Sequence, residues 1–348
     1  MQRHIIDEQS TILQALDKLN ALSGKVMTLF AVNADRRMTG ALTDGDIRRG
    51  LLAGAKPECR VSEVMNRNFQ ALEGGKIDIA RLRELRLAGM RLLPILDTDG
   101  RITDIIDTSI THTRLPLSAI MMAGGRGERL RPLTLNTPKP LLEVGGKAII
   151  DYNIEALAAC GITNIYVTVN YLAEKLEQHF SSPISGVSVK CVREDRPLGT
   201  IGAAALVPLP EQGDTLVMNS DLLTTASFEE MYLAHTAEQA DLTIAAIPYN
   251  VSVPFAILST DGNRVTALQE KPSYSYFANA GIYIISNRLL QNLSPSHRTD
   301  ATDLIDEAIN SGLKVTYYPI SGTWIDIGSP TDFRQANELM RHRALYGR

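Results

Sequence analysis

The chain has 348 residues, of which 44% are hydrophobic and 21% charged, and its formal net charge is −4 at pH 7. This composition is typical of a globular protein. The slight negative charge argues against nucleic acid as the main partner. No apolar run approaches the ~20 residues of a membrane-spanning helix. Three widely spaced cysteines and an N-terminus that turns acidic early favour a cytoplasmic protein with reduced thiols over a secreted one.

The first third of the chain contains an internal repeat. Residues 11–22 carry apolar side chains at helical spacing, and two strands joined by a polar turn at 33–37 follow them. At an offset of about 64 residues, the segments 77–85 and 91–110 repeat this order of helix, strand, turn and strand. Because one such unit cannot bury its own apolar face, we expect an α+β domain over residues 1–115 in which two copies pack as a pseudo-twofold pair.

This repeat resembles a pair of cystathionine β-synthase (CBS) domains, and the match is best over GALTDGDIRRGLL, residues 40–52. The resemblance implies that Thr43 and Asp46 hold the ribose and phosphates of an adenine nucleotide. Asp107 and Ile110 stand at these two positions in the second repeat, so at most one such site is expected. The alternative is a packing or dimerisation module that binds no ligand.

A short polar segment ending in proline, residues 108–116, is the predicted linker. From there on, strands and helices alternate, which is typical of a Rossmann-like α/β domain with a mostly parallel sheet, here over residues 116–348. Such sheets bind ligands beyond the carboxyl ends of their strands. Strands are predicted at 117–123, 164–170, 187–194, 215–219 and 242–249, and helices at 147–161, 172–180, 199–207 and 227–239.

The loop after the first of these strands, residues 122–141, is rich in glycine, proline and cations. A dinucleotide fingerprint is excluded because its third glycine position is Leu130 and three prolines prevent the helix that must follow. A Walker-type phosphate loop is excluded because G-K-[ST] is missing. The remaining interpretation is a glycine turn close to a nucleotide, with an extended segment that brings Arg129, Arg131 and Lys139 to its phosphates.

Residues 124–141, GGRGERLRPLTLNTPKPL, resemble the signature of sugar-1-phosphate nucleotidylyltransferases. Further segments of that family follow in its order: RPLGT at 196–200, VMNSD at 217–221, LQEKP at 268–272, NAGIYII at 279–285 and TWIDIGSP at 323–330. The resemblance covers essentially all of residues 118–348. It implies transfer of a nucleotidyl group from a nucleoside triphosphate to a sugar 1-phosphate, with release of pyrophosphate and with Mg²⁺ as cofactor.

The same resemblance implies a role for each matched residue. Arg129 and Lys139 would hold the triphosphate, and Asp221 and Asp326 would bind Mg²⁺, a cation that prefers carboxylate and phosphate oxygens. Lys271 would bind the sugar phosphate. The remaining substrate-binding positions are Glu270, Asn279 and Gly281 for the sugar, and Ala123, Gly124, Gly125, Gly199 and Thr200 for the base and ribose.

Several of these residues have an alternative interpretation. Asp221 would also serve as the cap of a following helix, Asp326 as part of a turn, and Lys271 as a solvated charge at the end of a hairpin. Glu128 stands where many family members have threonine, and its charge is unfavourable beside phosphates.

The fusion of a CBS pair to this domain resembles bacterial guanylyltransferases that make GDP-sugars for surface glycans, which favours GTP as substrate. A uridylyltransferase acting on an amino-sugar 1-phosphate is the next hypothesis, and a non-catalytic nucleotide sensor the third. CBS pairs commonly associate, so we expect a homo-oligomer.

Overall fold

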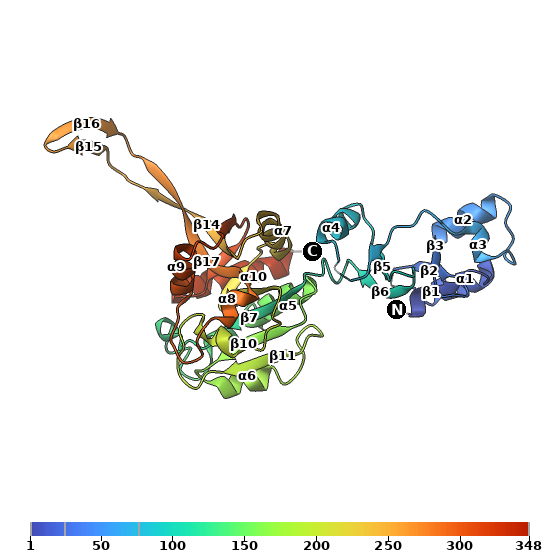
Figure 1. The fold of residues 1–348 in the computed structure, drawn as a ribbon, viewed down its shortest axis with the longest axis horizontal. Coiled ribbons are helices and arrows are strands. Elements are labelled where there is room, and N and C mark those ends of the chain that lie inside the picture. The colour runs from blue at the N-terminus through green and yellow to red at the C-terminus, as the bar shows by residue number, and fades with distance from the viewer. Residues whose placement is uncertain (1, 24–25, 76, 347–348) are drawn as a thin grey trace. The chain divides into compact units, whose positions relative to one another are not determined.

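The computed structural model describes residues 2–23, 26–75 and 77–346. The chain divides into two compact units, residues 1–114 and 115–348 (Figure 1). This division falls within the segment 108–116 that the sequence marks as a linker. None of the described helices is long and apolar enough to cross a membrane.

The six strands among the described residues of the first unit form two three-stranded sheets, ordered β1-β2-β3 and β4-β5-β6. In each sheet the first pair of strands is parallel and the second antiparallel, with a bulge near the end of the second pair. The elements are η1 Gln2–His4, β1 Ile5–Asp7, α1 Ile12–Asn20, β2 Thr28–Val32, β3 Met38–Thr43, α2 Asp44–Leu52, α3 Val61–Val64, β4 Leu72–Glu73, α4 Ile79–Leu87, β5 Leu92–Leu96 and β6 Ile102–Asp107.

The two turns of this unit show why the halves match. The Asn33 side chain accepts a hydrogen bond from the Arg37 amide at 3.0 Å, and the Asp97 side chain accepts one from the Arg101 amide at 2.8 Å. Short polar side chains of this type stabilise a tight turn by bonding the nearby backbone. The predicted helix–strand–turn–strand repeat is therefore present.

The second unit is built on a seven-stranded sheet with the order β11-β10-β7-β12-β17-β14-β18. All neighbouring pairs are parallel except the two that involve β17. The elements are β7 Leu117–Met122, η2 Glu128–Leu130, η3 Lys139–Leu141, β8 Glu143–Val144, β9 Lys147–Ala148, α5 Ile149–Ala159, β10 Ile165–Val169, α6 Ala173–His179, β11 Val189–Arg193, η4 Gly202–Leu206, β12 Asp214–Asn219, β13 Leu222–Thr224, α7 Phe228–Glu238, β14 Leu242–Ser252, β15 Ile257–Asp261, β16 Arg264–Gln269, β17 Ser273–Ser286, α8 Asn287–Gln291, α9 Ala301–Asn310, β18 Val315–Pro319, β19 Trp324–Asp326 and α10 Pro330–Tyr346.

Both faces of this sheet are covered. Ile120 of β7 and Val217 of β12 pack in one cluster with side chains of η4, α8 and α9. Their neighbours Ala119 and Met121, which point to the opposite face, are also fully buried. Burial on both faces is the rule for parallel sheets, and the predicted mixed α/β fold with a mostly parallel sheet is confirmed.

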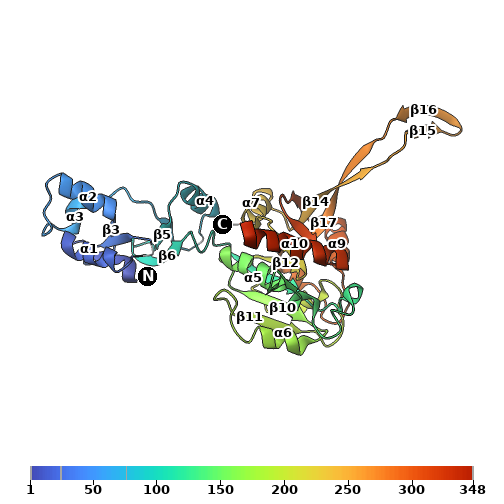
Figure 2. The ribbon, with the colours of Figure 1, turned by 180° about the vertical axis from the view of Figure 1, so that it is seen from behind.

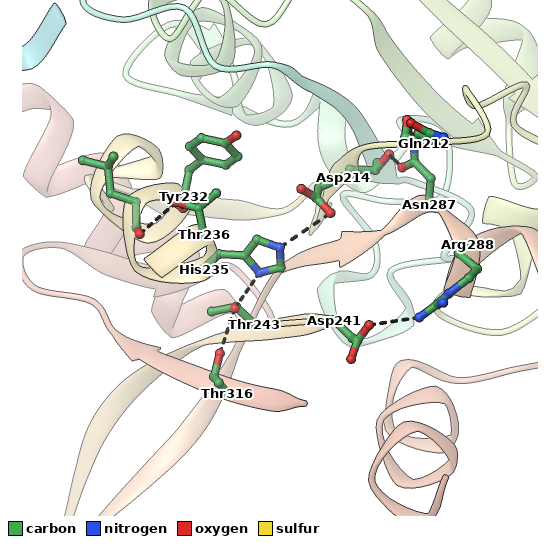
Figure 3. Close-up of polar contacts among 12 residues, drawn as sticks. Gln212, Asp214, Tyr232, His235, Thr236, Asp241, Thr243, Asn287, Arg288 and Thr316 are labelled. Carbon is green, nitrogen blue, oxygen red and sulfur yellow. Dashed lines mark hydrogen bonds and ion pairs between the residues drawn. The ribbon is translucent and has the colours of Figure 1, made fainter. Parts of the chain in front are cut away.

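A buried polar chain fixes helix α7 against the sheet (Figure 3). His235 of α7 is 2% exposed, and its Nδ1 lies 2.8 Å from the Thr243 hydroxyl of β14, which lies 2.9 Å from the Thr316 hydroxyl of β18. On the other side, Nε2 of His235 lies 3.6 Å from the Asp214 carboxylate at the start of β12. The chain satisfies polar groups that are costly to bury alone, so we read it as structural.

One predicted helix is not an α-helix. Residues 199–207 contain only the short 3₁₀ helix η4, Gly202–Leu206. Gly199 has a φ of +89°, which no right-handed helix accepts. The Thr200 amide donates to the side chain of Asp300, the N-cap of α9, and the Thr200 hydroxyl accepts from Ala301, the first residue of α9. Contacts made 100 residues away along the chain therefore override the apolar pattern of this segment.

A long hairpin, residues 249–277, leaves the sheet and extends away from it (Figures 1 and 2). It consists of the end of β14, the β15–β16 pair and the start of β17, and most of its residues are exposed. We call it the arm.

Candidate active site

The glycine-rich loop doubles back on itself beside the end of β7. Gly127 has a φ of +60°, and a Cβ at this position would lie 2.9 Å from a methyl carbon of Thr134 and 3.2 Å from Cβ of Lys139. The Thr134 hydroxyl donates to the Gly127 carbonyl at 2.8 Å. Only glycine allows this close approach without strain, and the result is that Lys139 returns to the point where the loop began.

Lys139 meets two aspartates there. Its ammonium group forms an ion pair with the Asp221 carboxylate and lies 3.7 Å from Oδ1 of Asp326. Asp221 follows β12, which is the neighbour of β7 in the sheet, and pairing of Leu222 with Asp326 in the β13–β19 ladder brings the second carboxylate beside the first. Three residues that the sequence singles out are thus placed together.

Asp326 is held in an unfavourable setting for a charge. Its side chain is 40% exposed overall, but Oδ1 is buried and receives no hydrogen bond from the described residues. Burial, and then the neighbouring Asp221 carboxylate, raise the pKa of Asp326 above its ordinary value, against the opposing effects of Lys139 and Arg129. Arg129 reaches this point from η2, with one guanidinium nitrogen 3.0 Å from where a Cβ of Gly328 would lie.

Two adjoining cavities lie beside this cluster, and Met122, Gly125 and Asp221 line both of them. The first has a volume of about 370 Å³ and is also lined by Ala123, Gly127, Glu128, Arg129, Leu130, Lys139, Pro140, Ser220 and Gly328. The second has about 440 Å³ and is also lined by Gly124, Thr168, Glu194, Pro197, Gly199, Thr200, Asn219, Arg298 and Asp300. Together they form a cleft at the carboxyl ends of β7 and β12, where α/β sheets bind ligands.

Glu194 is a charged, buried residue of this cleft that sequence reasoning missed. It is 6% exposed, its Oε2 accepts a hydrogen bond from the Leu198 amide at 3.0 Å, and burial raises the pKa of its carboxyl. Its other oxygen, Oε1, would lie 2.6 Å from a Cβ on Gly124, so glycine is needed at 124 to leave room for it. The available signal was a pair of acidic residues, Glu194 and Asp195, directly before the R-P-L-G-T segment.

The R-P-L-G-T loop serves as a wall of the second cavity. Gly199 packs on the backbone of Thr299, where a Cβ would approach the carbonyl oxygen to 2.4 Å. The Thr200 hydroxyl is engaged, because it accepts a hydrogen bond from the Ala301 amide at 2.8 Å. These two residues therefore shape the cavity through the backbone.

The residues expected to bind the sugar are not gathered in the cleft. Glu270 and Lys271 are exposed on the arm and line neither cavity. Asn279, in β17 beyond the base of the arm, donates to the Tyr283 hydroxyl at 3.0 Å and accepts from the Gly281 amide at 2.9 Å. Lys271 thus has the exposed hairpin position that its alternative interpretation describes.

Gly281 packs against Asn219, a residue that lines the second cavity. It has a φ of +69°, and a Cβ there would lie 2.5 Å from the side-chain nitrogen of Asn219, which lines the second cavity. Next to it, the Ala280 carbonyl accepts a hydrogen bond at 2.9 Å from the indole of Trp324, the only tryptophan of the chain. Trp324 begins the short strand β19 that ends at Asp326.

In the first unit, Thr43 and Asp46 bond mainly to each other. The Thr43 hydroxyl donates to the Asp46 carboxylate at 2.6 Å, the Thr43 amide donates to it at 2.8 Å, and Arg49 pairs with its other oxygen. This is a capping box at the start of α2. A cavity of about 740 Å³ lies elsewhere in the unit, with Lys18, Arg36 and Arg101 among its lining residues.

The acidic pair fits a magnesium ion. Among the described residues, no group of three histidine, cysteine, aspartate or glutamate side chains is arranged to hold a metal. Mg²⁺ is commonly bound by one or two carboxylates together with substrate phosphates, so a pair suffices. Asp221 and Asp326 converge on a single cationic group, and Asp326 presents an oxygen that no described residue satisfies.

The comparison with protein families decides the class. The model of a family described as nucleotidyl transferase matches residues 118–343, which include every residue of the two cavities. The chain belongs to the nucleotidyl transferase family. Its glycine-rich loop, Lys139 and the aspartate pair all lie within the matched nucleotidyl transferase region.

Sequence and structural similarity to individual proteins is consistent with this family. The nucleotidyl transferase region is 31% identical to a mannose-1-phosphate guanyltransferase of Schizosaccharomyces pombe over 232 residues and 32% identical to one of Neurospora crassa over 227 residues. Each match covers 62% of this chain and 62% of the relative, so the chain spans less than two thirds of their length. A Bacillus anthracis protein, solved with sucrose and described provisionally as a glucose-1-phosphate thymidylyltransferase, is 25% identical with a TM-score of 0.52, covering 65% of this chain and 95% of that one.

The raised pKa of Asp326 leads to a prediction about stability. At pH values between the ordinary and the raised pKa of Asp326, the folded protein keeps a proton on Asp326 that the unfolded chain releases. The stability that Asp326 contributes is therefore lost as pH rises through that range. We expect Asp326→Asn to raise the urea midpoint of unfolding at pH 7, and the gain to shrink towards pH 4. The matched control is Asp306→Asn, on the exposed side of α9. A lower midpoint for Asp326→Asn than for the parent at pH 7 would contradict the prediction.

Proposed function

We propose that this chain is a guanylyltransferase, which transfers GMP from GTP to a sugar 1-phosphate. The observation that carries the proposal is the convergence of Lys139, Asp221 and Asp326 beside a glycine loop in a nucleotidyl transferase cleft. Relatives named mannose-1-phosphate guanyltransferases support the choice of substrate class.

Glu194 favours guanine as the base. The Watson–Crick edge of guanine presents two neighbouring donors, N1–H and the exocyclic amino group, and a carboxylate is an acceptor only. Uracil presents one N–H between two carbonyl oxygens, which a carboxylate would repel. Glu194 and Gly124 both line the second cavity, with Oε1 of Glu194 beside Gly124, and Oε2 is already fixed by the Leu198 amide, so the carboxylate is oriented before any ligand arrives.

The reaction is a single in-line displacement at the α-phosphorus of GTP. An oxygen of the sugar 1-phosphate forms the new bond to phosphorus, and the bond from the α-phosphorus to the bridging oxygen of pyrophosphate breaks. The attacking phosphate is already anionic at pH 7, so neither a protein nucleophile nor a strong general base is required. The protein contributes position and charge.

The chain's own cations act on the departing group. Lys139 and Arg129 line the same cavity and offset the negative charge of the triphosphate, which increases on the leaving pyrophosphate. Ala123 and Gly125 border this cavity with little side-chain bulk, so that the phosphates approach the backbone. Asp221 and Asp326 would hold Mg²⁺, which when bound neutralises phosphate charge and orients the attack.

The experiment is a pyrophosphate-release assay with each of four nucleoside triphosphates against mannose, glucosamine and N-acetylmuramic acid 1-phosphates. We expect GTP to be the preferred donor. A preference for UTP with an amino-sugar 1-phosphate would replace the proposal by the uridylyltransferase alternative. Binding of GTP without turnover of any sugar phosphate would replace it by the nucleotide sensor.

We also propose that the first unit is a CBS pair that binds an adenine nucleotide. The internal repeat and the cavity that carries Lys18, Arg36 and Arg101 favour this second function. Isothermal titration of the whole chain with AMP, in the presence of saturating GTP to occupy the catalytic cleft, tests it. Absence of heat would leave the unit with a structural role.

The capping box gives a prediction for Thr43 that holds with or without a ligand. Replacing an N-cap threonine by alanine costs about 0.5–2 kcal/mol. We therefore expect Thr43→Ala to lower the local free energy of opening of α2 by about 1 kcal/mol, measured by hydrogen exchange of its amides. Thr11→Ala is the matched control, because Thr11 caps α1 with the same box and should affect α1 alone. Unchanged hydrogen exchange in α2 would show that the Thr43 cap contributes no stability to this helix.

A further inference from the structure

The second cavity of the cleft is lined by a cationic side chain, that of Arg298. The other described residues that line this cavity are neutral or acidic, and Glu194 and Asp300 are among the acidic ones. Lys139 and Arg129, which offset the charge of the triphosphate in the proposed function, line the first cavity instead. The ligand group that Arg298 meets is therefore the one in the second cavity, which the proposed function assigns to the base.

Arg298 is held in place by Asp300. Nη2 of Arg298 donates to Oδ2 of Asp300 at 3.1 Å, and Oδ1 of the same carboxylate accepts from the Thr200 amide at 2.9 Å. A guanidinium carries several N–H donors in one planar fork, so this bond restricts its orientation and leaves other donors for a ligand. Arg298 is thus an oriented donor at the edge of the cavity, with a side chain that is 71% exposed.

The segment that carries Arg298 is bonded to the loop that orients Glu194. The Leu198 amide donates to Oε2 of Glu194 at 3.0 Å, and the Leu198 carbonyl accepts from the Thr299 amide at 2.8 Å. The Thr299 carbonyl in turn accepts from the Gly202 amide at 3.1 Å. Glu194 and the backbone next to Arg298 are therefore bonded to the same residue, Leu198, which brings a fixed acceptor and a fixed donor to one wall of the cavity.

Guanine requires both kinds of partner. Its N1–H and 2-amino groups are donors, which the carboxylate of Glu194 accepts in the proposed function, whereas O6 and N7 on the adjoining edge are acceptors. The fork of an arginine donates two hydrogen bonds to O6 and N7, which is the commonest specific contact of proteins with guanine in DNA. Adenine carries an amino group in place of O6, and this group opposes the donors of an arginine.

We propose that Arg298 determines the choice of purine, by donating to O6 and N7 of the guanine whose N1–H and 2-amino groups bond Glu194. The inference rests on the proposed function, because it requires the base to occupy the second cavity. Glu194 alone discriminates incompletely between purines, since the amino group of adenine can also donate to a carboxylate. Arg298 supplies the missing discrimination, and the two residues together accept guanine and reject uracil and adenine.

The test compares kcat/KM for pyrophosphate release with GTP and with 7-deaza-GTP, in which a C–H group replaces N7. We expect the parent to be about tenfold slower with 7-deaza-GTP, because a hydrogen bond from a charged donor is lost. Arg298→Ala should be about 10- to 100-fold slower than the parent with GTP and should no longer distinguish the two nucleotides. A variant that only distorted the cavity would slow both nucleotides and keep the parental ratio.

Two variants and one further nucleotide serve as controls. Arg288→Ala removes a guanidinium that is 68% exposed and pairs with Asp241 at 3.2 Å but lines neither cavity of the cleft, so it should keep the parental kcat/KM and ratio. Arg298→Lys keeps the charge but loses the planar fork, and its ratio should fall below that of the parent. ITP, which lacks the 2-amino group that contacts Glu194, should be slowed equally in the parent and in Arg298→Ala.

The outcomes separate this inference from the proposed function. If the parent uses GTP without distinguishing it from 7-deaza-GTP, or if Arg298→Ala keeps the parental ratio, the role of Arg298 is wrong and the guanylyltransferase stands. If the parent prefers UTP, or transfers no nucleotide to any sugar 1-phosphate, the proposed function is wrong and the role of Arg298 is withdrawn with it.

Discussion

Lys139→Ala is expected to lower kcat for nucleotidyl transfer by about 10²- to 10³-fold, because a preorganised charged donor is lost from the transition state. Two effects add here. The pyrophosphate leaving group loses its cationic partner, and the carboxylates of Asp221 and Asp326 face each other without the ammonium between them. The measurement is pyrophosphate release at saturating GTP and sugar 1-phosphate.

Lys147→Ala is the matched control for this variant. Lys147 also pairs with a carboxylate, that of Glu155 at 2.6 Å, but it lines neither cavity of the cleft. We expect its kcat to remain within about twofold of the parent, since exposed pairs contribute little. A Lys139→Ala protein with parental unfolding behaviour and near-parental kcat would show that Lys139 has no role in the chemistry.

Glu194→Gln is expected to change the preferred base. Hydrogen bonds to a charged group are worth about 1.5–3 kcal/mol, so kcat/KM for GTP should fall by about 10- to 100-fold. If the amide oxygen keeps the bond from the Leu198 amide, the amide nitrogen faces the base and opposes the donors of guanine. The same nitrogen can donate to a uracil carbonyl, so the ratio of UTP to GTP turnover should rise.

The pH dependence of GTP binding provides a second readout at Glu194. Burial raises the pKa of this carboxyl, so it becomes protonated at a higher pH than an ordinary glutamate. The KM for GTP should rise as pH falls through the raised pKa, and this rise should be absent in Glu194→Gln. Glu177→Gln, which alters an exposed carboxylate paired with Arg193, is the control and should leave the base preference unchanged. An unchanged base preference in Glu194→Gln would remove Glu194 from base recognition.

The sequence predicts the parts of this fold that follow from local pattern. Alternating strands and helices indicate the mostly parallel sheet, and the prolines of residues 132–140 indicate that no α-helix follows the glycine turn. The meeting of Lys139 with Asp221 follows only in part. Asp221 comes just after a buried strand, and the loop that carries Lys139 starts at the end of the neighbouring strand, so both begin at one edge of the sheet.

Other features depend on contacts that no local pattern contains. Gly199 and Thr200 are not helical because Thr200 bonds residues at the start of α9, about 100 residues later in the chain. Glu194 stands in a charged run, R-E-D-R, that reads as solvent-exposed until β10, β11 and the glycine loop enclose it. The length of the arm does not follow from the sequence, since the alternation of a sheet strand is the same whether the strand ends at the sheet edge or continues beyond it.

Trp324 provides an intrinsic fluorescence probe beside the cleft. Because it is the only tryptophan among 348 residues, all indole fluorescence of the chain originates two residues from Asp326 and one hydrogen bond from the strand behind Asn219. Its emission is therefore a native optical signal from a position beside the cleft. Titrations of nucleotide, sugar phosphate or Mg²⁺ can be followed in the unmodified protein, without a label and without turnover.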